Sequence, residues 1–278
     1  MDYRGWIATM TLAAGLCVLM APAQAFDESK YPDWKGKWQR PTGERPVWVR
    51  PGDKAPLTPE YQAIFEANLA DQAEGGQGTD GTFTCLATGM PRTMMSYGPM
   101  EIVITPDVTY ILIEYIHDNR RVFTDGRDWP TQLEPAFEGY SIGRWIDADG
   151  DGRYDTLQVE TRGFRGPRAY DATGLPLHFD NQSVFMERIH RDKADPNILH
   201  DEITVIDHAL TRPWSVDKKY VRNPSPRVEW NEAYCNAEDT ALIAIGKEYY
   251  YKSADGRLMP TKKDQAPPDL GYFKQPQK

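Results

Sequence analysis

Four aspartates alternate with small residues in the stretch DADGDGRYD, residues 147–155, and this spacing suits a hard metal ion. In a calcium loop a curling backbone aims carboxylate and carbonyl oxygens inward at alternate positions. The twelfth position is Gln158 instead of the glutamate of an EF-hand, and both flanks read as strands. We therefore expect a weak, structural calcium site in a β-hairpin; the alternative is a hydrophilic hairpin tip without an ion. The expected ligands are Asp147, Asp149, Asp151, the carbonyl of Arg153, and Asp155.

Two further stretches, ILIEYIHDNRRVFTDGRDW and LHDEITVIDH, concentrate groups that could transfer protons. A histidine hydrogen-bonded to a carboxylate inside a water-excluding cavity could act as a general base. That chemistry would suit a cofactor-free isomerase, lyase or hydratase. Close zinc-ligand spacing and the Gly-x-Ser-x-Gly motif of serine hydrolases are both missing from the sequence, which argues against those enzymes. The candidate base is His117 or His200, and the candidate partners are Glu114, Glu202 and Asp207.

Arginines recur next to tryptophans along the chain. An arginine stacked on tryptophan can be a structural plug, or it can grip a carboxylate or phenolate in a pocket with aromatic walls. The second interpretation predicts a binding site for a small apolar or aromatic molecule. Its candidate residues are Arg92, Arg121, Asp125, Arg127, Arg144, His178 and Trp214.

The first 25 residues resemble a secretory signal. A short apolar run follows Arg4, and APAQA ends in the small-x-small pattern of a cleavage site. We expect cleavage after Ala25, no membrane anchor after cleavage, and a mature chain 26–278 in the periplasm or secreted. The formal net charge of −9 argues against nucleic acid as a partner.

Two cysteines, Cys85 and Cys235, remain after cleavage. In an oxidising compartment a lone pair most simply forms one disulfide bond, and the alternative is two buried thiols.

The elements that must position these residues are mostly strands. The exception is LTPEYQAIFEANLADQ, residues 57–72, where Thr58 can cap a helix with one apolar face. That face would consist of Tyr61, Ile64, Phe65 and Leu69. From residue 82 onward, short runs rich in β-branched and aromatic residues alternate with turn signals. Their short connections favour antiparallel pairing.

Several motifs resemble those of a broad group of secreted bacterial proteins with a predicted lipocalin-like (calycin-type) β-barrel. They are CLATGMPRTM, PMEIVITPDVTYIL, RRVFTDGRDWP, GYSIGRW, ALTRPWSV and EAYCNAE, and the resemblance covers nearly all of residues 83–240. Barrels of this kind also begin with a Gly-x-Trp pattern, which DWKGKW, residues 33–38, contains. The resemblance supports the Cys85–Cys235 disulfide and implies that the aspartate stretch replaces a tighter turn. It implies no particular chemistry.

The sequence therefore predicts an all-β fold, an antiparallel lipocalin-like barrel with one N-terminal helix and an extended C-terminal tail. We expect one domain, residues 26–278, that binds a small apolar or aromatic molecule and carries a structural calcium loop. The enzyme above is the alternative. A third possibility is a calcium-stabilised interaction protein acting through the proline-rich tail QAPPDLGYFKQPQK.

Overall fold

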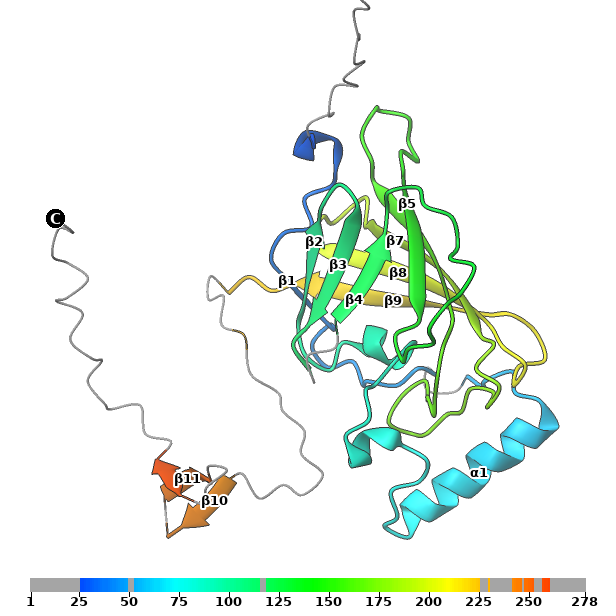
Figure 1. The fold of residues 1–278 in the computed structure, drawn as a ribbon, viewed down its shortest axis with the longest axis vertical. Helices are drawn as coiled ribbons and strands as arrows, with labels where there is room; N and C mark the ends of the chain where they lie inside the picture. The colour runs from blue at the N-terminus through cyan, green and yellow to red at the C-terminus, as the bar shows by residue number, and fades with distance from the viewer. Residues whose placement is uncertain are drawn as a thin grey trace, which may run out of the picture.

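A barrel of nine strands forms most of the part of the chain that the structure describes (Figure 1). The computed structural model describes residues 26–49, 53–115, 119–225, 230, 242–246, 248–252 and 257–260. The strands follow one another around the ring in chain order, and β9 pairs with β1 to close it. They are β1 (Lys37–Gln39), β2 (Met100–Ile104), β3 (Val108–Ile113), β4 (Asn119–Phe123), β5 (Tyr140–Ile146), β6 (Thr156–Arg162), β7 (Val184–Arg191), β8 (Ile198–Ile206) and β9 (Trp214–Arg222).

The predicted barrel is confirmed, but one strand pair is parallel instead of antiparallel. Strands β4 and β5 run in the same direction, with Val122 opposite Ser141 and Phe123 opposite Ile142. Parallel neighbours need a connection long enough to return to the starting edge. Residues 124–139 supply that connection, whereas the other neighbouring strands from β2 to β9 pair antiparallel. The expectation of a wholly antiparallel barrel was therefore wrong at this pair.

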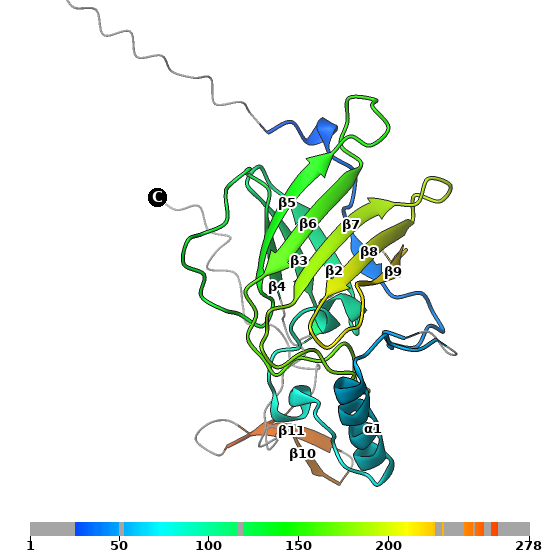
Figure 2. The same cartoon turned by 90° about the vertical axis from the view of Figure 1, so that its right-hand side faces the viewer.

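The predicted helix is confirmed as α1 (Pro59–Ala73), and the Oγ1 atom of Thr58 accepts a hydrogen bond from the Tyr61 amide at 3.4 Å. Its predicted apolar face is buried only in part. Tyr61 is buried, but Ile64 and Leu69 are each 40% exposed. The helix lies at one end of the barrel and the β5–β6 hairpin projects from the opposite end (Figure 2). Three short 3-10 helices complete the helical elements of the described residues: η1 (Glu28–Lys30), η2 (Gly81–Thr84) and η3 (Arg92–Met95).

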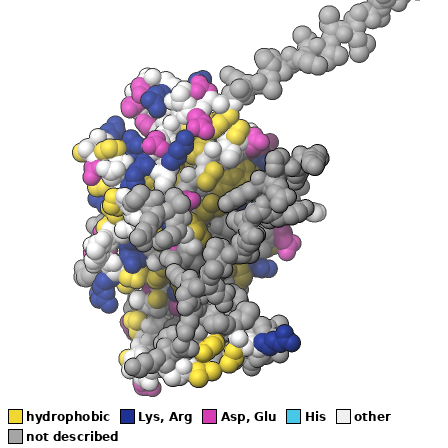
Figure 3. Space-filling model, turned by 90° about the vertical axis from the view of Figure 1, so that its left-hand side faces the viewer, with side chains coloured by type: hydrophobic (Ala, Val, Ile, Leu, Met, Phe, Trp, Pro, Cys, Tyr) yellow, Lys and Arg dark blue, Asp and Glu magenta, His cyan; other side chains and the backbone are white. Residues whose placement is uncertain are grey.

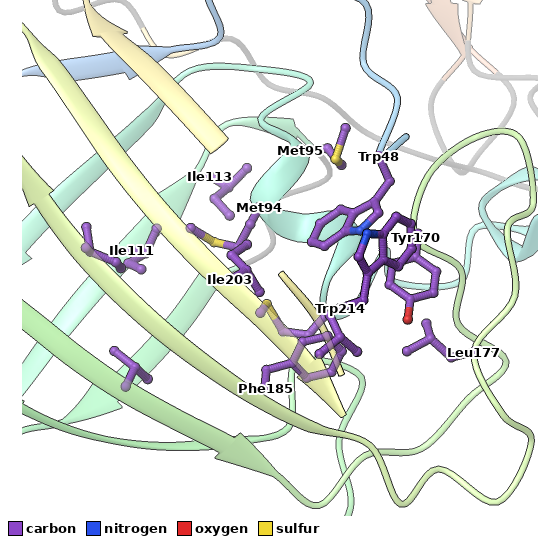
Figure 4. Close-up of a cluster of buried hydrophobic side chains, with 14 of the residues drawn as sticks. Trp48, Met94, Met95, Ile111, Ile113, Tyr170, Leu177, Phe185, Ile203 and Trp214 are labelled. Carbon is purple, nitrogen blue, oxygen red and sulfur yellow. The ribbon is translucent and has the colours of Figure 1, made fainter. Parts of the chain in front are cut away.

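The barrel interior is built by residues that alternate along each strand. On β7, Phe185, Glu187 and Ile189 are buried, while Met186 between them is exposed. This period of two follows from the pleat, which points successive side chains to opposite faces. Figure 4 shows how the buried side chains meet, with Trp48, Tyr170 and Trp214 gathered beside the interior residues Met94, Phe185 and Ile203.

The Gly-x-Trp stretch places Trp38 on β1, where its side chain is fully buried. The indole Nε1 atom donates to the carbonyl of Trp34 at 2.9 Å, and the Arg222 guanidinium lies 4.6 Å from the Trp38 ring centroid. Trp38 is therefore part of the packed barrel core.

A separate three-stranded antiparallel sheet follows in the chain. Its strands are β10 (Leu242–Ile245), β11 (Glu248–Lys252) and β12 (Leu258–Pro260), which the sequence did not lead us to expect. The predicted signal (1–25) and the EAYCNAE motif lie outside the described residues, as does the proline-rich tail.

Charged side chains of both signs are mixed on the face that Figure 3 shows.

Candidate functional site

A charged cluster lies inside the barrel, where most neighbouring side chains are apolar. Arg120 of β4 is 1% exposed and forms a two-pronged ion pair with Glu187 of β7. Its Nη1 atom donates to Glu187 Oε1 at 2.7 Å, and Nη2 contacts Oε2. Nη2 also donates to Thr161 Oγ1 at 2.8 Å, and Nε donates to Ser141 Oγ at 3.3 Å. These partners satisfy the guanidinium, so the cluster ties β4, β5, β6 and β7 together.

Asp201 of β8 adds a second carboxyl group to this interior. It is fully buried, and neither of its oxygens has a hydrogen-bond partner among the described residues. Burial raises the pKa of the Asp201 carboxyl well above its usual range, and the negative charge of Glu187 raises it further, although Arg120 opposes the rise. Burial therefore favours the neutral, protonated form of the Asp201 carboxyl.

A pocket lies in the side of the barrel, where β1 is short. Among the described residues, β9 pairs with β1 only at Trp38↔Arg222 and Gln39↔Val221. The rest of β9 faces residues 40–49, which follow β1, and η3. A cavity of about 880 Å³ lies between these segments, and we call it the seam pocket. The buried part of its wall consists of Trp48, Met94, Met95, Trp214 and Tyr220.

The aromatic wall of the seam pocket is a packed cluster. The Trp48 and Trp214 rings meet edge-on with centroids 6.3 Å apart, and Tyr170 packs behind both at 5.2 and 5.4 Å. Aromatic groups in such arrangements give a rigid apolar surface. Met94 and Met95 line the facing side, and methionine side chains adapt to the shape of a ligand.

A lysine brings positive charge to this wall. Lys218 is held by the carbonyl of Val47, to which its Nζ atom donates at 3.2 Å. The same ammonium lies 4.6 Å from the Trp48 ring centroid. Lys218 is the cross-strand neighbour of Asp201, so the pocket and the interior acid adjoin one another on β8 and β9. The pocket also includes charged groups of both signs: Arg40, Glu44, Arg45, Asp53, Asp217 and Lys219.

Tyr220 joins the pocket to the buried charges. Its hydroxyl donates to the carbonyl of Met94 at 2.6 Å. Burial raises the pKa of the Tyr220 phenol well above its usual range, and the charges of Asp201 and Glu187 add to the rise. The phenol therefore stays protonated and acts as a neutral polar group at the inner end of the seam pocket.

The residues predicted to bind a ligand are spread over the molecule, and only Trp214 lines the seam pocket. Arg92 is buried in an ion pair with Asp80, and its guanidinium lies 5.3 Å from the Tyr97 ring. That arrangement matches the structural alternative for these arginines.

Three other residues of that set cluster at the end of β4. The Arg121 and Arg127 guanidinium groups lie 5.0 and 3.9 Å from the Phe123 ring centroid, and Arg127 forms an ion pair with Asp125. These contacts again resemble the structural plug, not a ligand site.

Arg144 lies on the outside of the barrel, where its Nη2 atom donates to Gln158 at 2.8 Å. With Trp129 it lines a second cavity of about 540 Å³ over the outer face of β5, β6, β7 and β8. An arginine beside a tryptophan in a pocket was expected, and here the pocket lies on the outer face of the barrel.

The predicted proton-transfer residues do not come together around one cavity. His200 lies on the outer face of β8, where Asp217 at 3.0 Å and Asp192 at 3.1 Å flank its ring. Glu202 is on the same face and pairs with Arg188 at 2.9 Å. The alternation that buries Asp201 directs both of these side chains outward.

The remaining three candidates are also separated. Glu114 is buried directly after β3, and its backbone amide donates to the carbonyl of Pro99. Asp207 follows β8 and accepts a hydrogen bond from the His178 amide at 2.9 Å. His117 lies outside the described residues.

The aspartate hairpin brings three of its predicted calcium ligands together. Oxygens of Asp147, Asp149 and Asp151 lie within 4.8 Å of one another. Gly150 and Gly152 turn the loop with φ of 78° and 87°, in the left-handed region that glycine tolerates best. The loop amides of Gly150 and Gly152 donate to the Asp147 carboxylate at 2.7 and 2.9 Å.

The other two predicted ligands, Arg153 and Asp155, lie at the end of the same loop. Asp155 accepts a hydrogen bond from the Ala148 amide at 3.2 Å, which closes the hairpin base. The Arg153 amide donates to Asp151 Oδ1 at 2.8 Å. Oxygen ligands of this kind suit calcium.

The predicted disulfide remains a prediction, because Cys235 lies outside the described residues. Cys85 directly follows η2 and has a left-handed backbone with φ of 58°.

The fold defines the class of this protein as a small closed β-barrel with a side pocket. No protein-family model, curated protein or solved structure matches the chain. The lipocalin-like relationship therefore stays a prediction. Each helix in the described residues is too short or too polar to cross a membrane.

Proposed function

We propose that this protein binds a small molecule with an aromatic or apolar body and one acidic group, and that it does so in the seam pocket. The observation that carries this proposal is the buried wall of Trp48 and Trp214 with the Lys218 ammonium beside it. Aromatic walls with a few placed polar groups are typical of small-molecule sites. A volume of about 880 Å³ falls in the range of such sites.

The chemistry of the wall sets the class of ligand. The two indoles and the methionines favour a flat apolar body. The Lys218 ammonium favours a carboxylate, sulfonate or phenolate at the edge of that body, because a charged hydrogen bond is stronger than a neutral one. The Tyr220 hydroxyl, whose hydrogen is donated to Met94, adds a neutral acceptor oxygen at the inner end of the pocket.

Binding of an anionic naphthalene sulfonate dye to the full mature chain tests this proposal. We expect saturable binding of one dye per chain, with displacement by an arylcarboxylic acid and weaker displacement by the corresponding amide. The amide retains the apolar body and lacks the charge, so the difference isolates the contribution of the ammonium. Dye fluorescence that rises without saturation, or equal displacement by acid and amide, would refute the proposal.

We further propose that the aspartate hairpin binds calcium as a structural ion. Three carboxylates within 4.8 Å repel one another, and a divalent cation would relieve that repulsion. We expect millimolar calcium to raise the melting temperature relative to chelator, and Asp149→Asn to abolish that rise. Asp195→Asn in the β7–β8 turn is the matched control and should keep the response. Equal melting temperatures of the wild type with calcium and with chelator would count against an ion here.

Secretion with cleavage after Ala25, and a disulfide between Cys85 and Cys235, complete the proposal. Both rest on the sequence patterns described above. The intact mass of the protein recovered from the periplasm tests both, because cleavage fixes the expected mass and a disulfide lowers it by two hydrogens. A mass matching the full chain, or two alkylatable thiols in the denatured protein, would contradict them.

A further inference from the structure

A group of two histidines and one aspartate lies near α1, apart from the seam pocket and from the aspartate hairpin. It consists of His178 and Asp180, between β6 and β7, and His208, directly after β8. One ligand atom of each lies within 4.8 Å of the other two. From this geometry we propose that His178, Asp180 and His208 form a site for a divalent transition-metal ion such as Zn²⁺.

Both histidine rings lie within hydrogen-bond distance of the Asp180 carboxylate. The Nδ1 atom of His178 lies 2.9 Å from Asp180 Oδ1, and the Nδ1 atom of His208 lies 2.6 Å from Asp180 Oδ2. The Asp180 amide also points its hydrogen at His178 Nδ1 at 3.2 Å. In the tautomer whose Nδ1 accepts that hydrogen, a lone pair of the ring faces the carboxylate oxygen, and a metal ion between the two atoms would replace the proton that pairs them in the other tautomer.

The ligand types fit zinc better than calcium. Imidazole nitrogen and carboxylate oxygen bind zinc at about 2.0 to 2.2 Å, whereas calcium selects oxygen ligands alone. Around a tetrahedral ion at that distance, ligand atoms are about 3.4 Å apart. The two contacts with Asp180 are slightly shorter than this, so small side-chain rotations would admit the ion.

Asp180 is positioned by a backbone contact of its own segment. The Gln182 amide donates to Asp180 Oδ1 at 3.0 Å, while Oδ2 faces the His208 ring.

A rigid frame holds the two histidine-bearing segments together. Asp207 is buried, and its Oδ1 atom accepts hydrogen bonds from the amides of His178 at 2.9 Å and Ala209 at 2.8 Å. Its Oδ2 atom accepts a hydrogen bond from Ser183 Oγ at 2.5 Å. Supporting contacts of this kind orient metal ligands before the ion arrives.

One side of the site is open to solvent. The His208 side chain is 70% exposed, and Phe179, whose ring stacks on His178 with centroids 4.5 Å apart, is 78% exposed. Tyr61 of α1 packs against His178 at 5.1 Å. Three protein ligands with an open fourth position leave room for water or for an anionic group of a ligand.

Titration of the tag-free mature protein with Zn²⁺, followed by calorimetry, tests this proposal. We expect binding of one ion through these residues, with His208→Ala and Asp180→Asn each weakening it more than about tenfold. Because His208 is largely exposed, its replacement should leave the circular dichroism spectrum and the melting temperature without metal unchanged. Co²⁺ in place of Zn²⁺ should give the visible absorption of a nitrogen- and oxygen-coordinated ion and lose it in the same variants.

His200→Gln is the matched control, because His200 also lies between two carboxylates but on the outer face of the barrel. We expect this variant to bind Zn²⁺ like the wild type. Absence of binding would overturn the proposal. So would binding that persists in His208→Ala and Asp180→Asn, or binding that is lost in His200→Gln instead.

Discussion

Replacing Arg120 by methionine is expected to lower the free energy of unfolding by about 3 to 5 kcal/mol. The substitution leaves the Glu187 carboxylate buried without its two guanidinium hydrogen bonds, and an uncompensated buried charge is costly. Ser141 and Thr161 would lose a partner in the same step. Urea unfolding, followed by tryptophan fluorescence, measures the loss.

The neighbouring residue provides the control for this prediction. Arg121 points outward from the same strand, so Arg121→Met should change stability by less than about 1 kcal/mol. The double variant Arg120→Met/Glu187→Leu should recover much of the stability, because an apolar pair of similar volume can replace a buried ion pair. A small change in the free energy of unfolding for Arg120→Met, or a double variant less stable than the single one, would contradict the claim that the Arg120–Glu187 ion pair compensates the buried charge.

Replacing Asp201 by asparagine is expected to abolish most of the loss of stability that the wild type shows as the pH rises. Because burial raises the pKa of Asp201 in the folded state, the folded protein binds the proton more tightly than the unfolded chain does. This contribution is therefore fully present below the ordinary carboxyl pKa, and it is lost as the pH rises toward the folded-state pKa. Asparagine resembles the neutral acid and has no proton to lose.

Melting temperatures of wild type and Asp201→Asn at a series of pH values from 4 to 9 measure this effect. Asp107→Asn, in the exposed β2–β3 turn, controls for the change in net charge. Asp201→Leu should also raise stability at neutral pH by about 1 to 3 kcal/mol, because it removes a buried carboxyl group that has no hydrogen-bond partner among the described residues. A melting temperature that rises with pH in the wild type, and does not rise in Asp201→Asn, would mean that this carboxyl is ionised and paired.

The strands could be predicted because the sequence pattern and the local geometry agree. The stretch ILHDEITVI forms β8, and every second side chain in it is buried, among them Leu199 and Ile203. The same alternation also buries Asp201, and Arg120 and Glu187 occupy the corresponding positions on their strands. A charged residue at a strand position that the alternation predicts to be buried was thus a usable signal for the interior cluster. The prediction favoured His200 instead because it is a histidine with carboxylate neighbours, and His200 lies on the outer face.

Other features depend on long-range packing that local patterns do not encode. The parallel pairing of β4 with β5 depends on the path of residues 124–139, which contain no regular element. The seam pocket depends on where β1 stops pairing with β9, and no residue type near Gln39 marks that point. Trp48 and Lys218 were missed for this reason. The two sides of the His178–His208 group are distant in sequence, and the buried Asp207 carboxylate brings them together.

The central claim is that the seam pocket binds an aromatic or apolar acid through the ammonium of Lys218. The most direct test compares the affinity of the anionic naphthalene dye for wild type, Lys218→Met and Lys193→Met, with a neutral naphthylamine dye as a check on the pocket itself. Lys218 faces the pocket wall beside Trp48, whereas Lys193 is exposed in the β7–β8 turn and does not line the pocket. We predict about tenfold weaker binding of the anionic dye to Lys218→Met, or about 1.4 kcal/mol, with unchanged binding to Lys193→Met and unchanged neutral-dye binding throughout. Equal affinity of the anionic dye for all three proteins would contradict the account.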